Sequence, residues 1–214
     1  MSMTCRTCLA GLALVLFVGS GRSADPARPV VPGFERFFNG DKVDHGQGGR
    51  LLLTELNCIS CHGASDATLA RKQAPILDQV GNRVRVGHLR KFLRDPQAVK
   101  PGTTMPHLLA GDPDAESKAE ALLHFLASTG SVRKDRPDGK LIAAGRDLYS
   151  KVGCVVCHGT RDAAGDQDKV WPTSVPLGDL KSKYSVASLA AFLENPHATR
   201  PSGRMPRILS GKES

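Results

Sequence analysis

A pentapeptide with two cysteines and a histidine, Cys-x-x-Cys-His, occurs twice in this chain. The first copy runs from Cys58 to His62 and the second from Cys154 to His158. Two thiols on one helical turn can form thioether bonds to the two vinyl groups of one porphyrin, and the histidine that follows can bind the iron. The sequence therefore predicts two covalently bound haem c groups, attached at Cys58, Cys61 and His62 and at Cys154, Cys157 and His158.

The sixth ligand of each iron decides what the haem can do. Met105 and Met205 are the only methionines beyond residue 3, and each precedes a proline in a proline-rich loop. A methionine is most often core filler, but a loop braced by prolines favours a fixed ligand. We therefore expect Met105 and Met205 to be the sixth ligands, because His/Met coordination saturates the iron and suits outer-sphere electron transfer.

Other polar residues could support these sites. Each ligand histidine needs an acceptor for its Nδ1 proton, and backbone carbonyls near Pro75 and near Val175 or Pro176 are the expected source. Haem propionates could bond Arg83, Lys183, Tyr184 and Trp171, although solvated positions are an equal alternative. For the remaining histidines we expect surface or satisfied-core roles, with His107 a possible competitor of Met105: His45, His88, His107, His124 and His197.

A zinc site is an alternative interpretation of the two motifs. Two cysteines and one histidine would need a fourth ligand, and nothing favours the repeated methionine for zinc.

The two halves of the chain match beyond the haem motif. Residues separated by 100 positions are identical at Leu77, Val86, Leu89, Phe92, Leu93, Pro96, Pro101, Met105 and Pro106, whose counterparts are Leu177, Val186, Leu189, Phe192, Leu193, Pro196, Pro201, Met205 and Pro206. The motif cysteines are separated by 96 positions. This self-similarity indicates two tandem structural units.

The local patterns in each unit predict helices. Residues 48–56 and 140–152 lead into the motifs, and residues 86–94 and 186–194 carry apolar residues at helical spacing before Pro96 and Pro196. Residues 114–128 predict an amphipathic helix with an inner face of Ala121, Leu122, Phe125 and Leu126. No alternating strand pattern of useful length occurs, so we expect an all-α fold.

The N-terminus has the features of a signal peptide, residues 1–24. Leu9 to Val18 is an apolar stretch that falls well short of the ~20 residues needed to span a membrane. We therefore expect export to the periplasm, with membrane attachment only if the signal is retained. Cys5 and Cys8 lie in this segment, and the four remaining cysteines all belong to the two motifs.

Composition narrows the class of protein. The 214 residues are 40% hydrophobic but only 5% aromatic, which gives each half a lean core that a bound haem would enlarge. The formal net charge is +8, which we interpret first as a solubilising surface; a basic rim that steers acidic redox partner proteins is the alternative. Nucleic-acid binding is not expected, because no basic run is interleaved with aromatic residues.

These residues resemble class I c-type cytochromes, in which a helix ends in Cys-x-x-Cys-His and a later loop carries Met-Pro. The resemblance implies two tandem class I cytochrome c domains, residues 46–130 and 140–214, joined by a linker (131–139) and preceded by an N-terminal extension (25–45). It also implies His62 with Met105 and His158 with Met205 as iron ligands. In this family a C-terminal helix crosses the first helix; residues 114–128 supply it in the first unit.

The second unit stops at Ser214, soon after Met205. We therefore expect it to lack the C-terminal helix, and a further domain to follow Ser214. The arrangement also resembles cytochrome modules at the start of large exported proteins of some environmental bacteria.

The expected function is that of an exported dihaem c-type cytochrome that transfers electrons between redox partner proteins. A dihaem peroxidase, which needs one iron with an open sixth site, is the alternative, together with the electron-entry module of a larger oxidoreductase.

Overall fold

The computed structural model describes residues 31, 33–38, 43–162, 166, 168–169, 171, 174–175 and 177–209. The expected signal peptide and much of the N-terminal extension lie outside these residues. All regular elements in the described ranges are helices, with no strand among them. The all-α prediction is therefore confirmed for this part of the chain.

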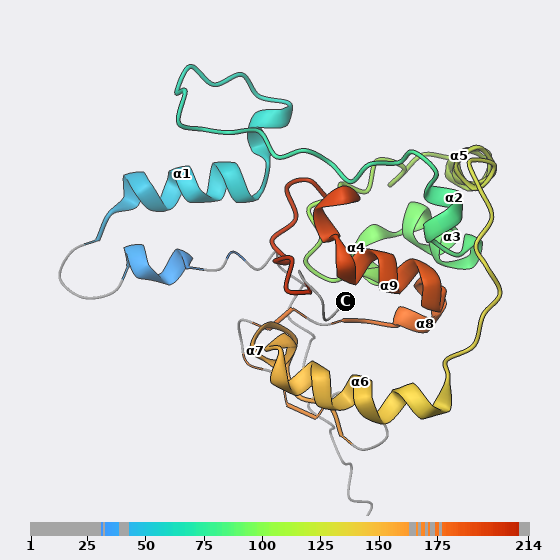
Figure 1. Cartoon of the computed structure of the whole chain (residues 1–214). Helices are drawn as coiled ribbons and strands as arrows, with labels where there is room; N and C mark the ends of the chain where they lie inside the picture. The colour runs from blue at the N-terminus through green and yellow to red at the C-terminus, as the bar shows by residue number, and fades with distance from the viewer. Residues whose placement is uncertain are drawn as a thin grey trace, which may run out of the picture.

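The elements follow one another as a series of short helices (Figure 1). In chain order they are η1 (Phe34–Phe37), α1 (His45–Glu55), η2 (Cys58–Ser60), α2 (Val80–Arg83), α3 (Val86–Arg94), α4 (Pro96–Val99), α5 (Ala115–Ala127), α6 (Gly139–Lys151), α7 (Cys154–His158), α8 (Leu180–Lys183), α9 (Val186–Glu194) and η3 (Pro196–Ala198).

The repeat seen in the sequence is reproduced in the secondary structure. The helices α8 and α9 begin and end 100 positions after α2 and α3. Pro96 and Pro196, both fully buried, begin the helical turns that follow. The residue before the first motif cysteine is left-handed in both units, Asn57 with φ 61° and Gly153 with φ 89°. Equivalent residues therefore make equivalent local turns.

The main apolar core is small and lies in the first unit. Val80, Leu89 and Leu123, from α2, α3 and α5, are buried together. Figure 1 shows α5 above this group of helices and α1 well away from it, on the opposite side of the molecule. The expected crossing of the first helix by residues 114–128 is therefore not seen, because α5 packs on α3 instead.

The face that α5 turns inward also differs from the prediction. Ala119 and Leu123 are buried and Leu126 is partly buried, whereas Ala121 is exposed, Leu122 is 46% exposed and Phe125 is 70% exposed. The predicted inner face is wrong for these last three residues. Packing explains the difference: Leu123 and Leu126 pack with Val80 and Leu89 of α2 and α3, and the neighbouring carboxylates of α5 lie where they pair with arginines of α3.

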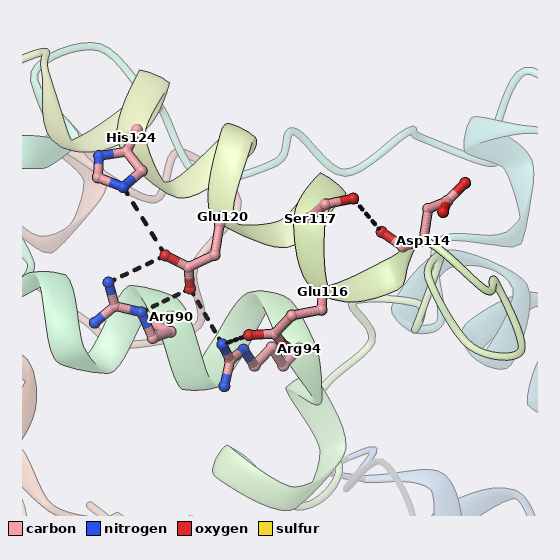
Figure 2. Close-up of polar contacts among 7 residues, drawn as sticks. All are labelled: Arg90, Arg94, Asp114, Glu116, Ser117, Glu120 and His124. Atoms are coloured by element: carbon pink, nitrogen blue, oxygen red, sulfur yellow. Dashed lines mark hydrogen bonds and ion pairs between the residues drawn. The ribbon is translucent and has the colours of Figure 1, made fainter.

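Those ion pairs form one network between α3 and α5 (Figure 2). The Arg90 guanidinium donates to both oxygens of Glu120, at 2.7 and 3.1 Å. Arg94 donates to Glu116 and, at 3.2 Å, to Glu120. The His124 Nε2 lies 3.9 Å from the second Glu120 oxygen. Glu120 therefore joins the two helices at the centre of the network.

Replacing Leu123 with alanine should destabilise the protein strongly. Leu123 is 0% exposed, so its loss leaves a cavity and should lower the free energy of unfolding by ~2–5 kcal/mol. The neighbouring Leu122→Ala variant is the matched control and should cost less than about 1 kcal/mol. Urea unfolding monitored by circular dichroism measures both. Equal losses for the two variants would contradict the observed orientation of α5.

The Glu120 network should make stability depend on pH. Hydrogen bonds from Arg90 lower the pKa of Glu120. Its stabilising contribution is then fully present above the ordinary Glu pKa of about 4.3 and is lost as the pH falls through the lower, folded-state value. Glu120→Gln should therefore lower the urea midpoint of unfolding at neutral pH and leave it unchanged well below pH 4. Glu116→Gln, at an exposed position, should shift it less; a pH-independent effect of Glu120→Gln would contradict this.

Hydrogen bonds join the first unit and the linker to the second unit. The N–H of Arg85 donates to the Lys183 carbonyl at 2.9 Å, and its Nε donates to the Tyr184 carbonyl at 2.9 Å. From the linker, the carboxylate of Asp135 accepts the N–H groups of Val186 and Ala187 at 2.9 and 3.0 Å. Both the first unit and the linker therefore hold the α8–α9 region.

No helix in the described part of the chain combines the length and the apolar character that crossing a membrane would require.

Candidate functional site

The second Cys-x-x-Cys-His motif forms a single helical turn, α7. Gly153, in a left-handed conformation that favours glycine, lets the chain turn from α6 into it. Cys154 and Cys157 are three positions apart, so their side chains lie on the same side of the turn. Neither forms a disulfide, and burial raises the pKa of the Cys154 thiol. Two neighbouring thiols are thus available for bonding to one ligand.

The His158 ring is fixed by a loop that lies far along the chain. Its Nδ1 lies 2.7 Å from the Val175 carbonyl oxygen. Since a carbonyl can only accept, Nδ1 carries the proton and the lone pair is on Nε2, the nitrogen suited to a metal. The Val175 N–H in turn donates to the Cys157 carbonyl at 2.8 Å. The carbonyl acceptor expected near Val175 is therefore present.

The first motif is less constrained. The 3₁₀ turn η2 brings the N–H of His62 to the Cys58 carbonyl, at 3.0 Å. The His62 side chain is exposed and forms no hydrogen bond with the described residues. The expected acceptor near Pro75 is not brought to it.

The sequence supplies a reason for this difference between the two motifs. Pro75 occupies the position of Val175 but has no N–H to donate to the motif. The N–H groups around it bond the second unit instead: Gln73 donates to the Ser202 hydroxyl at 2.8 Å and Ile76 to the Thr199 carbonyl at 2.9 Å. This segment is therefore drawn away from the first motif.

Matching side chains brace the two methionine loops. The Gln97 side chain donates to the Thr103 carbonyl at 2.8 Å. At the equivalent positions of the second unit, the His197 Nε2 donates to the Gly203 carbonyl at 3.1 Å. Sequence reasoning missed both braces, although a hydrogen-bonding residue eight positions before each methionine was a detectable signal. Met105 and Met205 themselves are partly buried.

The Met205 loop makes its polar contacts with the first unit as well as with its own. Besides the bond from Gln73 to Ser202, the Arg204 guanidinium lies 3.7 Å from a carboxylate oxygen of Glu55, at the end of α1. The structure thus brings the Met205 loop beside the helix that leads into the first motif.

Removing either brace should loosen its methionine loop. Gln97→Ala and His197→Ala each lose one hydrogen bond, which contributes about 0.5–1.5 kcal/mol to stability. We expect each variant to lower the free energy of unfolding by that amount and to increase proteolytic cleavage within its own loop only. His107→Ala, an exposed position in the first loop, is the control. Cleavage that rises equally in both loops would contradict a local bracing role.

The remaining histidines make the contacts expected of surface or core residues. His88 stacks on Phe92 with ring centroids 6.1 Å apart, and burial together with the charge of Lys183 lowers its pKa to about 4. His45 packs edge-on against Phe38, and His124 joins the Glu120 network. His107, the possible competitor of Met105, is exposed.

The described residues contain no group of three or more His, Cys, Asp or Glu side chains that could hold a metal ion. A haem iron takes one histidine and one methionine from the chain, so the haem interpretation does not depend on such a group. Comparisons of the chain with protein-family models, with curated proteins and with solved structures found no match.

Proposed function

We propose that this protein is an exported electron carrier that holds two c-type haems in tandem cytochrome-like units, residues 46–130 and 140–214. The observation that carries the proposal is the motif of the second unit. There, two free cysteines on one helical turn precede a histidine whose Nδ1 proton is committed to the Val175 carbonyl, 2.7 Å away. This donor set fits a haem that is bonded through two thioethers and one imidazole.

Each group has a separate role in this proposal. Cys58 with Cys61, and Cys154 with Cys157, anchor the two haems, and a bound haem supplies a one-electron couple. The Val175 carbonyl holds the His158 ring in one tautomer and orientation, so that Nε2 is presented as a ligand. The Met105 and Met205 thioethers complete the coordination, and saturated iron favours electron transfer over substrate binding.

The distribution of apolar residues supports a large apolar ligand. The buried core is small, while apolar side chains in or close to the second motif are exposed, Val156 by 74% and Leu148 by 52%. A porphyrin packed against this region would remove such surface from water, at about 25 cal/mol per Å². The amino acids of the second unit alone do not achieve this burial.

The N-terminal sequence supports the same proposal. Residues 1–24 have the pattern of a signal peptide, and periplasmic redox partner proteins are the expected donors and acceptors.

A redox titration of the purified protein, followed by visible spectroscopy, tests the proposed function. We expect two haems per chain and a reduced spectrum that does not change when carbon monoxide or hydrogen peroxide is added. If one haem binds carbon monoxide and reacts with peroxide, the protein is a peroxidase instead. If protein purified from a host that matures c-type cytochromes contains zinc and no haem, both the electron-carrier and the peroxidase functions are wrong.

A further inference from the structure

A cavity of about 200 Å³ lies between the two units. The first unit contributes Leu77, Val80 and Val84 from around α2, and the second contributes Ala191 and Phe192 from α9. These walls are apolar. The volume is below the range of about 300–1,000 Å³ that is typical of pockets for drug-sized ligands, so any occupant is small or only partly inserted.

Three cationic side chains also line this cavity, Arg83 from the first unit and Lys183 and Arg200 from the second. None of the three forms an ion pair with a carboxylate among the described residues. Arg83 donates to the backbone carbonyls of Ile76 and Asp78. Positive charge is therefore concentrated in an apolar recess, an arrangement that is unfavourable unless an anion compensates it.

Aromatic rings hold two of these cations in place. Tyr184 and Phe192 stack with centroids 6.0 Å apart. The Lys183 ammonium lies 4.8 Å from the Tyr184 ring centroid, and the Arg200 guanidinium lies 5.5 Å from that of Phe192. Cation–π contacts of this kind orient charged groups without neutralising them.

The cations also repel one another. Burial, together with the charges of Arg200 and Lys100, lowers the pKa of Lys183 to about 7. The pKa of Lys100 is lowered for the same reasons, with Arg200 and Arg204 as the nearby charges. An anion in the cavity would relieve this repulsion.

We propose that the cavity between the two units binds a carboxylate carried on a small apolar body, with its charge met by Lys183, Arg200 and Arg83. Two sources share this chemistry: a free amphipathic carboxylate, or a propionate of one of the chain's own haems. The site itself stands on the cavity and its cations, and only the second source rests on the proposed haem function.

The test combines two measurements on the purified full-length protein. Calorimetric titration with sodium octanoate at about pH 6, where Lys183 is protonated, measures binding, and 1-octanol serves as the uncharged comparison. Redox titration measures the midpoint potential of each haem. Both are made on the wild type, Lys183→Met, Arg200→Met and the control Lys181→Met, whose lysine is exposed on the same short helix α8.

If the ligand is a free carboxylate, octanoate should bind the wild type and Lys181→Met with equal affinity. It should bind Lys183→Met and Arg200→Met about tenfold or more weakly. Octanol should bind the wild type weakly. For a haem propionate, octanoate should not bind, and Lys183→Met should lower one haem potential that Lys181→Met leaves unchanged.

The carboxylate site is wrong if Lys183→Met binds octanoate as tightly as the wild type does. It is also wrong if octanoate does not bind and Lys183→Met alters no haem potential. If the purified protein carries no haem, the proposed function is wrong, but the cavity site is still tested by octanoate binding, which does not require haem.

Discussion

Replacement of both Cys154 and Cys157 with alanine is expected to remove one of two haems and to leave the other in place. The thioether bonds are the covalent anchors, and α7 carries both thiols of its unit on one turn. The first motif, on η2, forms an independent turn. Intact-mass analysis should therefore show one added haem in place of two, and the haem absorbance per chain should fall by about half.

The reciprocal variant, with Cys58 and Cys61 replaced by alanine, is the matched control and should retain only the second haem. Material must come from a host that attaches c-type haem to exported proteins. If the wild type from such a host shows the mass of the bare polypeptide, the haem proposal is wrong. If removal of one pair of cysteines abolishes both haems, attachment at one unit requires the other.

The parts of the fold that were predictable depend on short-range signals. Proline at 96 and at 196 ends a helix because the residue before it is driven out of the helical region, and the structure ends α3 and α9 there. The α2–α3 pair recurs as α8–α9 because the apolar spacing that encodes it recurs. In the same way, the helices before each motif could be read from local periodicity.

The parts that were not predictable depend on contacts between distant segments. The face of α5 is set by its packing on Val80 and Leu89 and by its ion pairs with the arginines of α3, all of which lie more than 20 residues earlier. Apolar spacing alone cannot show whether Leu122 or Leu123 is buried, because neither spacing nor helix propensity contains information about the helix against which α5 packs. The docking of α8 on Arg85 likewise has no local signature.

The candidate site also has parts that could be predicted from the sequence and parts that could not. The motif residues and methionines are recognisable because chemistry fixes their types and spacing. The sequence predicted the region that supplies the carbonyl acceptor for His158. It did not predict that the first motif lacks an equivalent acceptor, because that depends on the N–H of Val175, which bonds the second motif and which Pro75 does not have. The braces Gln97 and His197 have different side chains, so a search for identical residues overlooks them.

Replacement of a methionine ligand by leucine should have the second large effect. Leucine keeps most of the apolar volume, so that the change isolates the sulfur. Loss of the thioether should abolish the sulfur-to-iron charge-transfer band of one haem and lower its midpoint potential by about a tenth of a volt or more, within the ~0.8 V range over which axial ligands act. The opened iron should then bind carbon monoxide.

The contacts of the Met205 loop determine how this experiment should be designed. Its neighbours Ser202 and Arg204 contact Gln73 and Glu55 of the first unit, whereas the proposed pairing assigns Met205 to His158. Met105→Leu and Met205→Leu should therefore each be made in the background that lacks Cys154 and Cys157, where only the first haem remains. The band should disappear with Met105→Leu and persist with Met205→Leu.

The opposite result would show that Met205 reaches across to the iron held by His62, and the docking of the two units would then be part of the coordination. If neither substitution changes the spectrum, the sulfur assignment is wrong for the first haem. His107→Ala would next test the imidazole two positions from Met105, because a bis-histidine iron lacks the charge-transfer band from the start and has a lower potential than a His/Met iron.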